Sequence, residues 1–335
     1  EGIVLLKNDG VLPLKKNSTV TPYGYAYANP AYSGTGAAST GSQNNVSPEQ
    51  GLEKYFKIDK SVASAVAAAK THYPDAADGT PALDYDKNSL QAKTDAGKSA
   101  RIYEFDRAAY EEGAQTSSTN NAAVVFISRN GSEGLDKRTF GYDDGTAHYL
   151  ALTQAEKDMI RVAKEHSASV TVVLNTANPM EVAPLMSGET EVNAIVWMGT
   201  AGPRGFKSLG NVLSGAVNPS GRLTDIYATD FTKDPTFANF GEYGYSNVTY
   251  KDTTLISSGE QRPWPFVEYE EGVYVGYKYY ETAAVEDPQF VYGQRDAAGA
   301  STQVGAVANP LGYGMSHNPF WQETNSLRLN AYGKA

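Results

Sequence analysis

Short apolar runs alternate with amphipathic segments through the middle of the chain. Residues 122–128 (AAVVFIS), 169–175 (SVTVVLN) and 192–198 (VNAIVWM) are nearly continuous apolar runs, which is typical of parallel strands buried on both faces of a sheet. Between the first two runs, residues 153–156 (TQAE) form a capping-box sequence. This sequence predicts a helix that begins there and runs to about His166. Strands separated by helices at this spacing indicate right-handed βαβ units.

The flanking sequence extends this pattern on both sides. Residues 18–25 predict a first strand, residues 26–45 a long loop and residues 223–228 a short last strand. We expect further helices over residues 47–56, 59–72, 88–98, 106–113, 179–186 and 206–213. The predicted fold is therefore a three-layer α/β/α sandwich with a mainly parallel sheet. We expect the strands near 18–25, 122–128, 169–175 and 192–198 to share that sheet.

The two ends of the chain have a different character. The apolar residues 3–6 near the start indicate the end of a buried helix, and the abrupt beginning indicates a piece of a longer polypeptide. After residue 230 the sequence changes to long loops rich in Tyr, Phe and Gly. We expect residues 230–310 to be a loop-rich segment that wraps on the first core. The sandwich domain is thus placed at 1–323, and the start of a linker to a following domain at 324–335.

Composition excludes several classes of function. The net charge of -10 argues against nucleic acid or anionic lipid as a partner. The chain has no Cys, which excludes disulfides, thiolate metal sites and a Cys nucleophile. No run of about 18 apolar residues predicts a membrane span, and the four His lack metal-ligand spacing. No metal and no cofactor are expected. The polar, Cys-free composition favours a bacterial extracytoplasmic location over the cytoplasm, without fixing it.

The loop after residues 122–128 offers a candidate for catalysis. It reads SRNGSEGLDKR and places Glu133 between small neighbours, where a substrate could approach a carboxylate closely. Ligands of such sheets bind at the carboxyl ends of the strands. Asp136 and Arg138 could orient the carboxylate or hold the loop. The alternative is an ordinary solvated loop carboxylate without a role.

Two other interpretations are weaker. Gly34-Thr-Gly36 suggests a flavodoxin-like nucleotide-binding protein, but the third Gly of the fingerprint is absent. No GxSxG sequence surrounds a serine, which argues against a Ser-His-Asp hydrolase.

Five segments, taken in order, resemble glycoside hydrolase family 3, the retaining β-glucosidase and β-xylosidase family. They are residues 1–14 (EGIVLLKNDGVLPL), 132–136 (SEGLD), 218–223 (NPSGRL), 269–282 (YEEGVYVGYKYYET) and 310–315 (PLGYGM). The first resembles the entry into the family's second domain, and the second its S-E-G-Y-D loop. The ordered set covers the chain from end to end.

The resemblance implies that Glu133 is the general acid/base, with Asp136 and Arg138 as supports. Leu135 replaces the family's common Tyr, and Lys137 its common Arg, so the resemblance does not define substrate preference.

Other expectations concern the rest of the family's machinery. Pro203 stands where many members carry Glu. The family's (β/α)8 barrel, which supplies an Asp nucleophile, has no counterpart in this sequence. Asp225 and Asp230 follow the NPSG turn and belong to this domain, so neither is that nucleophile. The chain resembles the α/β sandwich domain alone, in the permuted group that carries it before the barrel.

The resemblance therefore implies a domain of a retaining, exo-acting β-glycosidase, most simply a β-glucosidase. Its partners would be a β-linked glycoside and a barrel domain of the same polypeptide, and the chain alone would be inactive. The alternative is a non-catalytic carbohydrate-binding or interaction module on the same fold.

Overall fold

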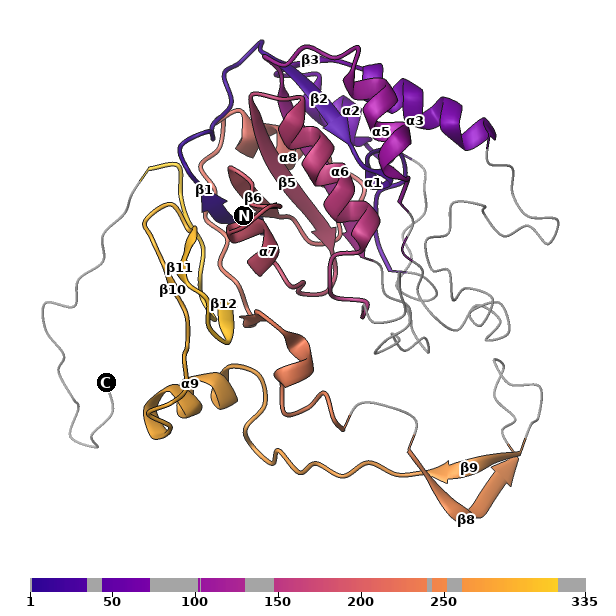
Figure 1. Cartoon of the computed structure of the whole chain (residues 1–335), viewed down its shortest axis with the longest axis vertical. Helices are drawn as coiled ribbons and strands as arrows, with labels where there is room; N and C mark the ends of the chain where they lie inside the picture. The colour runs from indigo at the N-terminus through magenta and orange to yellow at the C-terminus, as the bar shows by residue number, and fades with distance from the viewer. Residues whose placement is uncertain are drawn as a thin grey trace, which may run out of the picture.

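A six-stranded sheet lies at the centre of the molecule (Figure 1). The computed structural model describes residues 2–34, 44–72, 102, 104–129, 148–239, 243–251 and 261–318. In sheet order the strands are β1 (Val4–Asn8), β6 (Ala194–Trp197), β5 (Ser169–Thr176), β4 (Ala122–Arg129), β2 (Thr19–Tyr23) and β3 (Lys57–Ile58). Neighbours from β6 to β3 pair in parallel, and β1 pairs with β6 antiparallel. The prediction that four strands share one mainly parallel sheet is confirmed.

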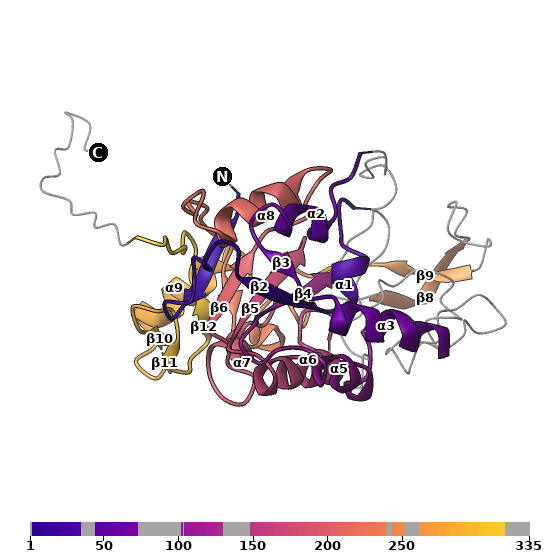
Figure 2. The same ribbon diagram turned by 90° about the horizontal axis from the view of Figure 1, so that it is seen from above.

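Helices cover both faces of the sheet, as Figure 2 shows from above. They are α1 (Tyr25–Ala28), α2 (Pro48–Leu52), α3 (Ser61–His72), α5 (Arg107–Ala114), α6 (Gln154–Glu165), α7 (Ala183–Met186) and α8 (Gly205–Leu213). Helix α9 (Tyr277–Glu286) lies further along the chain and packs in a separate small core. One core cluster lies between the sheet and α3, α5, α6 and α7, and a second between the sheet and α1, α2 and α8. Two apolar layers on one sheet make the three-layer sandwich that the sequence predicts.

Local signals set the helix boundaries. Helix α6 begins after Thr153, whose side chain accepts the backbone N–H of Glu156, and ends before His166. This is the predicted capping box. Helix α2 begins in the same way after Ser47, whose side chain accepts from the N–H of Gln50. The helix expected over 88–98 lies outside the described residues.

The prediction that residues 3–6 form the end of a buried helix was wrong. These residues enter the edge strand β1, where Val4 pairs with Trp197 and Leu5 with Val196. Val4 and Leu6 join one core cluster, whereas Leu5 joins the other. Side chains of a strand alternate between its two faces, so a strand buried on both faces reads as an unbroken apolar run. A run of four such residues cannot distinguish this from a buried helix.

Short strands complete the fold beyond the sheet. They are β7 (Tyr227–Ala228), β8 (Gly244–Lys251), β9 (Gln261–Pro265), β10 (Gln294–Arg295), β11 (Ser301–Gln303) and β12 (Val307–Asn309), with a 3-10 helix at Phe231–Lys233. The strand expected at 223–228 is shorter in the structure, where only β7 forms. Strand β7 pairs with β12 and not with the central sheet. A small core of Ile226, Ala228, Tyr280 and Val307 joins these elements.

The C-terminal part of the described chain returns to the free edge of β1. The N–H of Asn8 donates to the carbonyl of Ala298 at 2.8 Å, and that of Met315 to the carbonyl of Leu5 at 2.8 Å. An uncovered strand edge invites pairing with other chains, so these contacts protect it. The boundary predicted at residues 323 and 324 lies outside the described residues. None of the helices described is both long and apolar enough to cross a membrane.

Candidate functional site

The candidate site lies where the parallel strands end. Strands β2, β4, β5 and β6 run in the same direction, so their carboxyl ends form one edge. Glu133, Asp136 and Arg138 belong to residues 130–147, which lie outside the described residues, so their positions stay predictions. The residues on either side are described. The segment leaves the sheet at Arg129, the last residue of β4, and rejoins the described chain at His148.

A buried arginine connects the two ends of that segment. The Arg129 Nε donates to the carbonyl of Tyr149 at 2.7 Å, and its Nη2 donates to the carbonyl of Ala151 at 2.8 Å. Its two Nη atoms also donate to the Glu156 carboxylate at 2.6 and 2.8 Å. The Arg129 side chain is 0% exposed. We call these four residues the arginine clamp, because one guanidinium fixes the chain before and after residues 130–147.

Glu156 has two structural functions in this clamp. One oxygen of its carboxylate accepts the backbone N–H of Thr153 at 2.9 Å and so completes the cap of α6. The same carboxylate holds Arg129 in a bidentate pair, the geometry that best suits a buried guanidinium. Sequence reasoning found the cap and missed the ion pair. The available signal was the single Arg that ends an otherwise apolar strand.

A second buried carboxyl group lies close to the end of β2. Glu104 accepts the N–H groups of Phe105 at 2.9 Å and of Tyr25 at 3.2 Å, and it also accepts the Tyr110 hydroxyl. Burial raises the pKa of Glu104 to about 8, the nearby negative Glu156 adds to the increase, and the three donors oppose it. Glu104 is therefore mostly protonated at neutral pH. No pattern in the sequence indicates that Glu104 is buried.

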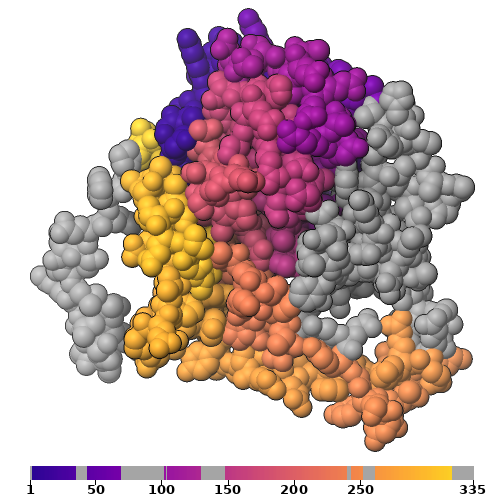
Figure 3. Space-filling model, viewed as in Figure 1, coloured from indigo at the N-terminus to yellow at the C-terminus, as the bar shows by residue number. Residues whose placement is uncertain are grey.

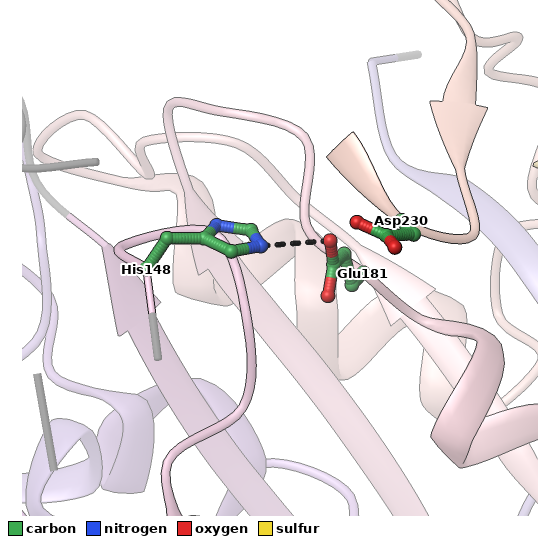
Figure 4. Close-up of side chains that lie close together, drawn as sticks. All are labelled: His148, Glu181 and Asp230. Atoms are coloured by element: carbon green, nitrogen blue, oxygen red, sulfur yellow. Dashed lines mark hydrogen bonds and ion pairs between the residues drawn. The ribbon is translucent and has the colours of Figure 1, made fainter. Parts of the chain in front are cut away.

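A third polar cluster joins the far end of the segment to the C-terminal part of the chain (Figure 4). His148 Nε2 lies 2.8 Å from a Glu181 carboxylate oxygen, which also accepts the N–H of Phe231 at 2.7 Å. Asp230 lies beside them, and one carboxylate oxygen of each and a ring nitrogen of His148 fall within 4.8 Å of one another. Asp230 also accepts the N–H of Thr232 at 2.9 Å. Hydrogen bonds within the protein account for this cluster, and we assign no cation to it.

An asparagine makes the rest of the edge rigid. Asn175, near the end of β5, exchanges hydrogen bonds with the backbone of Ala31 at 2.7 and 2.9 Å and donates to the carbonyl of Gly199 at 2.7 Å. The Trp197 indole donates to the carbonyl of Thr176 at 3.0 Å. These bonds connect the loops that follow β2, β5 and β6. The edge is thus a fixed platform for any segment that rises from it.

The fold and this edge define an α/β sandwich domain that presents loop residues at the ends of its parallel strands. Residues 3–277 match the family described as the glycosyl hydrolase family 3 C-terminal domain. Because the match covers most of the 335 residues, the chain belongs to this family of glycoside hydrolases.

Curated relatives carry names from the same enzyme class. The chain is 26% identical to thermostable β-glucosidase B of Acetivibrio thermocellus, over 88% of this chain and 31% of the relative. It is also 26% identical to β-glucosidase A of Butyrivibrio fibrisolvens, over 96% of this chain and 34% of the relative. The chain therefore spans about a third of the length of these relatives.

Solved structures share the fold at lower identity. A β-glucosidase from Paenibacillus barengoltzii superposes with a TM-score of 0.66 at 23% identity, covering 98% of this chain and 30% of that chain. β-Glucosidase 3B of Thermotoga neapolitana gives a TM-score of 0.62 at 23% identity, covering 94% and 36%. These likenesses support the sandwich fold.

Proposed function

We propose that this chain is the sandwich domain of a retaining, exo-acting β-glycosidase, most simply a β-glucosidase, to which it contributes the general acid/base Glu133. A (β/α)8 barrel of the same polypeptide, following this domain in chain order, would supply the Asp nucleophile. The observation that carries the proposal is the arginine clamp. In a member of this family, a buried Arg129 fixes both ends of the segment that contains Glu133 at the carboxyl edge of the sheet.

The chemistry requires two carboxyl groups about 5–5.5 Å apart, on either side of the glycosidic bond. The nucleophile attacks the anomeric carbon while Glu133 protonates the departing oxygen. Glu133 then removes a proton from the water that hydrolyses the glycosyl-enzyme. Asp136 and Arg138 would support its loop. Since a displacement of about 1 Å can cost about 100-fold in rate, a loop that carries an acid benefits from rigid ends.

The test is Glu133→Ala in the complete polypeptide, with the exposed Glu53→Ala as a matched control. For alkyl glucosides, whose leaving oxygen is basic, kcat/KM should fall towards the upper end of the ~10²–10⁴-fold range for general acid catalysis. For dinitrophenyl glucosides, which need no proton, it should fall far less. Azide should rescue the variant and give the β-glycosyl azide. A loss that is uniform across leaving groups, without azide product, would remove Glu133 from the mechanism and favour a non-catalytic carbohydrate-binding module.

A further inference from the structure

Exposed hydrophobic side chains gather on one segment of the molecule. In the described part of the chain, ten of the fifteen exposed large hydrophobic residues lie between Tyr243 and Tyr277. Among them, Tyr269 is 75% exposed, Val273 69% and Trp264 53%. We call residues 243–251 and 261–277 the aromatic arm. Exposed apolar surface gathered in this way marks an interaction site more often than scattered single residues do.

The arm does not bury its own surface. Its hairpin, β8 and β9, is exposed at nearly every position, and a two-stranded hairpin alone is marginally stable in water. Within it, Tyr250 packs edge-on to Trp264 with ring centroids 5.4 Å apart, and Tyr245 lies 4.9 Å from Phe266. These ring pairs stiffen the hairpin, yet its outer surface has no cover from the rest of the described chain. Figures 1 and 3 show β8 and β9 projecting away from the sandwich.

The arm is nevertheless fixed at its base. Helix α9 follows it directly, and Tyr280 of this helix is 1% exposed in the small core with Ile226, Ala228 and Val307. On the other side, the chain enters the arm after Phe231, whose N–H donates to Glu181 beside His148. The arm therefore emerges at the same carboxyl edge as the arginine clamp.

The chemistry of the arm selects among partners. The arm carries Glu268, Glu270 and Glu271 against Lys251 and Arg262. It therefore lacks the excess of basic residues that binds an anionic membrane surface. Strand β9 contains Pro263 and Pro265, and proline has no N–H to offer to an added strand. Pairing of strand edges between two copies of the chain is thereby hindered. The arm suits a protein surface with apolar hollows and nearby basic groups.

We infer that the aromatic arm is the surface through which this domain docks on the barrel domain of the same polypeptide, an inference that rests on the proposed function. The curated relatives are about three times as long as the matched region, which accounts for 31% and 34% of their length. A partner that covered the arm would also face the clamp and the segment that contains Glu133. Docking through the arm would bring the acid to a nucleophile held on the other domain.

Hydrogen–deuterium exchange tests this on the complete polypeptide and on the 335-residue chain. Arm amides should exchange at least about tenfold more slowly in the complete polypeptide, because a docked hairpin opens less often. The triple variant Trp264→Ser, Tyr269→Ser, Val273→Ser should restore fast exchange in the arm while leaving the protection of β4 and β5 unchanged. The control pair Val285→Ser and Val304→Ser, at residues 79% and 64% exposed outside the arm, should change neither.

Three results would overturn the inference. One is equal exchange of the arm in both proteins. Another is protection of the arm that grows with the concentration of the 335-residue chain alone, together with a dimer in sedimentation, which would assign the arm to a second copy. The third is protection of the arm by anionic vesicles alone. The proposed function has a separate test. The dependence of the Glu133→Ala activity loss on the leaving group tests the acid, whereas hydrogen exchange of the arm does not depend on catalytic turnover.

Discussion

Replacing Glu104 by Gln should stabilise the domain at alkaline pH and leave it almost unchanged at acidic pH. The folded protein keeps this carboxyl group neutral, because burial raises its pKa from the ordinary 4.5 to about 8. A pKa raised on folding gives a contribution to stability that is complete below pH 4.5 and is lost as the pH rises through about 8. Glutamine has the same shape and keeps an oxygen that accepts from Phe105, Tyr25 and Tyr110. It has no charge to bury.

The expected size follows from the two pKa values. At 1.36 kcal/mol for each pKa unit, the change from 4.5 to about 8 corresponds to roughly 5 kcal/mol at most. Integrated between pH 5 and pH 8, the free energy of unfolding of the wild type should fall by roughly 3 to 4 kcal/mol relative to the variant. The slope is steepest midway between the two pKa values, where it approaches about 1.4 kcal/mol per pH unit, and it decreases towards pH 5 and pH 8. At pH 5 the two proteins should agree within about 1 kcal/mol, the net value of a hydrogen bond.

Urea unfolding, followed by circular dichroism at pH 5, 6, 7 and 8, measures this difference. Glu112→Gln is the matched control, because Glu112 is an exposed residue of α5, the helix that also carries Tyr110. Its curve should run parallel to that of the wild type. If the Glu104→Gln curve is also parallel, with a constant offset, then Glu104 is ionised in the folded protein across this range and the reasoning fails.

Two further predictions concern the clamp and the isolated chain. Glu156→Gln removes the charge that faces the buried Arg129 and should lower the free energy of unfolding, measured in a urea titration, by about 3 kcal/mol. The control Glu165→Gln lies on the same helix, where Glu165 is 51% exposed in its ion pair with Arg107, and should cost under about 1 kcal/mol. Equal losses in the two variants would contradict the arginine clamp. The purified chain should not hydrolyse aryl β-glucosides, because a general acid without a nucleophile cannot form the glycosyl-enzyme. Hydrolysis by a preparation that contains no other protein would refute the proposal that the acid and the nucleophile lie on different domains.

The central sheet could be predicted because its strands carry their own signal. Strands β4 and β5 are unbroken apolar runs with buried positions almost throughout, and the Thr153 capping box marks where α6 begins. Strand β1 was misread for a reason that is general. Val4 and Leu6 face one core and Leu5 the other. The strand pairs with residues of β6 that lie about 190 positions away in the sequence, and local periodicity cannot report such a distant partner.

The polar contacts at the carboxyl edge could not be predicted for a related reason. The side chains of Arg129 and Glu156 meet across 27 positions, and Asn175 reaches Ala31 across 144. Each looks like an ordinary polar residue until the sheet brings it together with its partner. Glu104 differs from an exposed glutamate only in the burial that the fold provides. Positions of Glu133, Asp136 and Arg138 rest on resemblance alone.

The two buried carboxyl groups at this edge connect stability to the proposed site. Glu156 faces a guanidinium, whereas Glu104 faces only neutral donors, and the charge of Glu156 helps to keep the Glu104 proton in place. Losing that proton would put a second negative charge near the carboxylate that holds Arg129. Because Arg129 fixes both ends of the segment that contains Glu133, ionisation of Glu104 in the folded protein should also loosen the support of that segment.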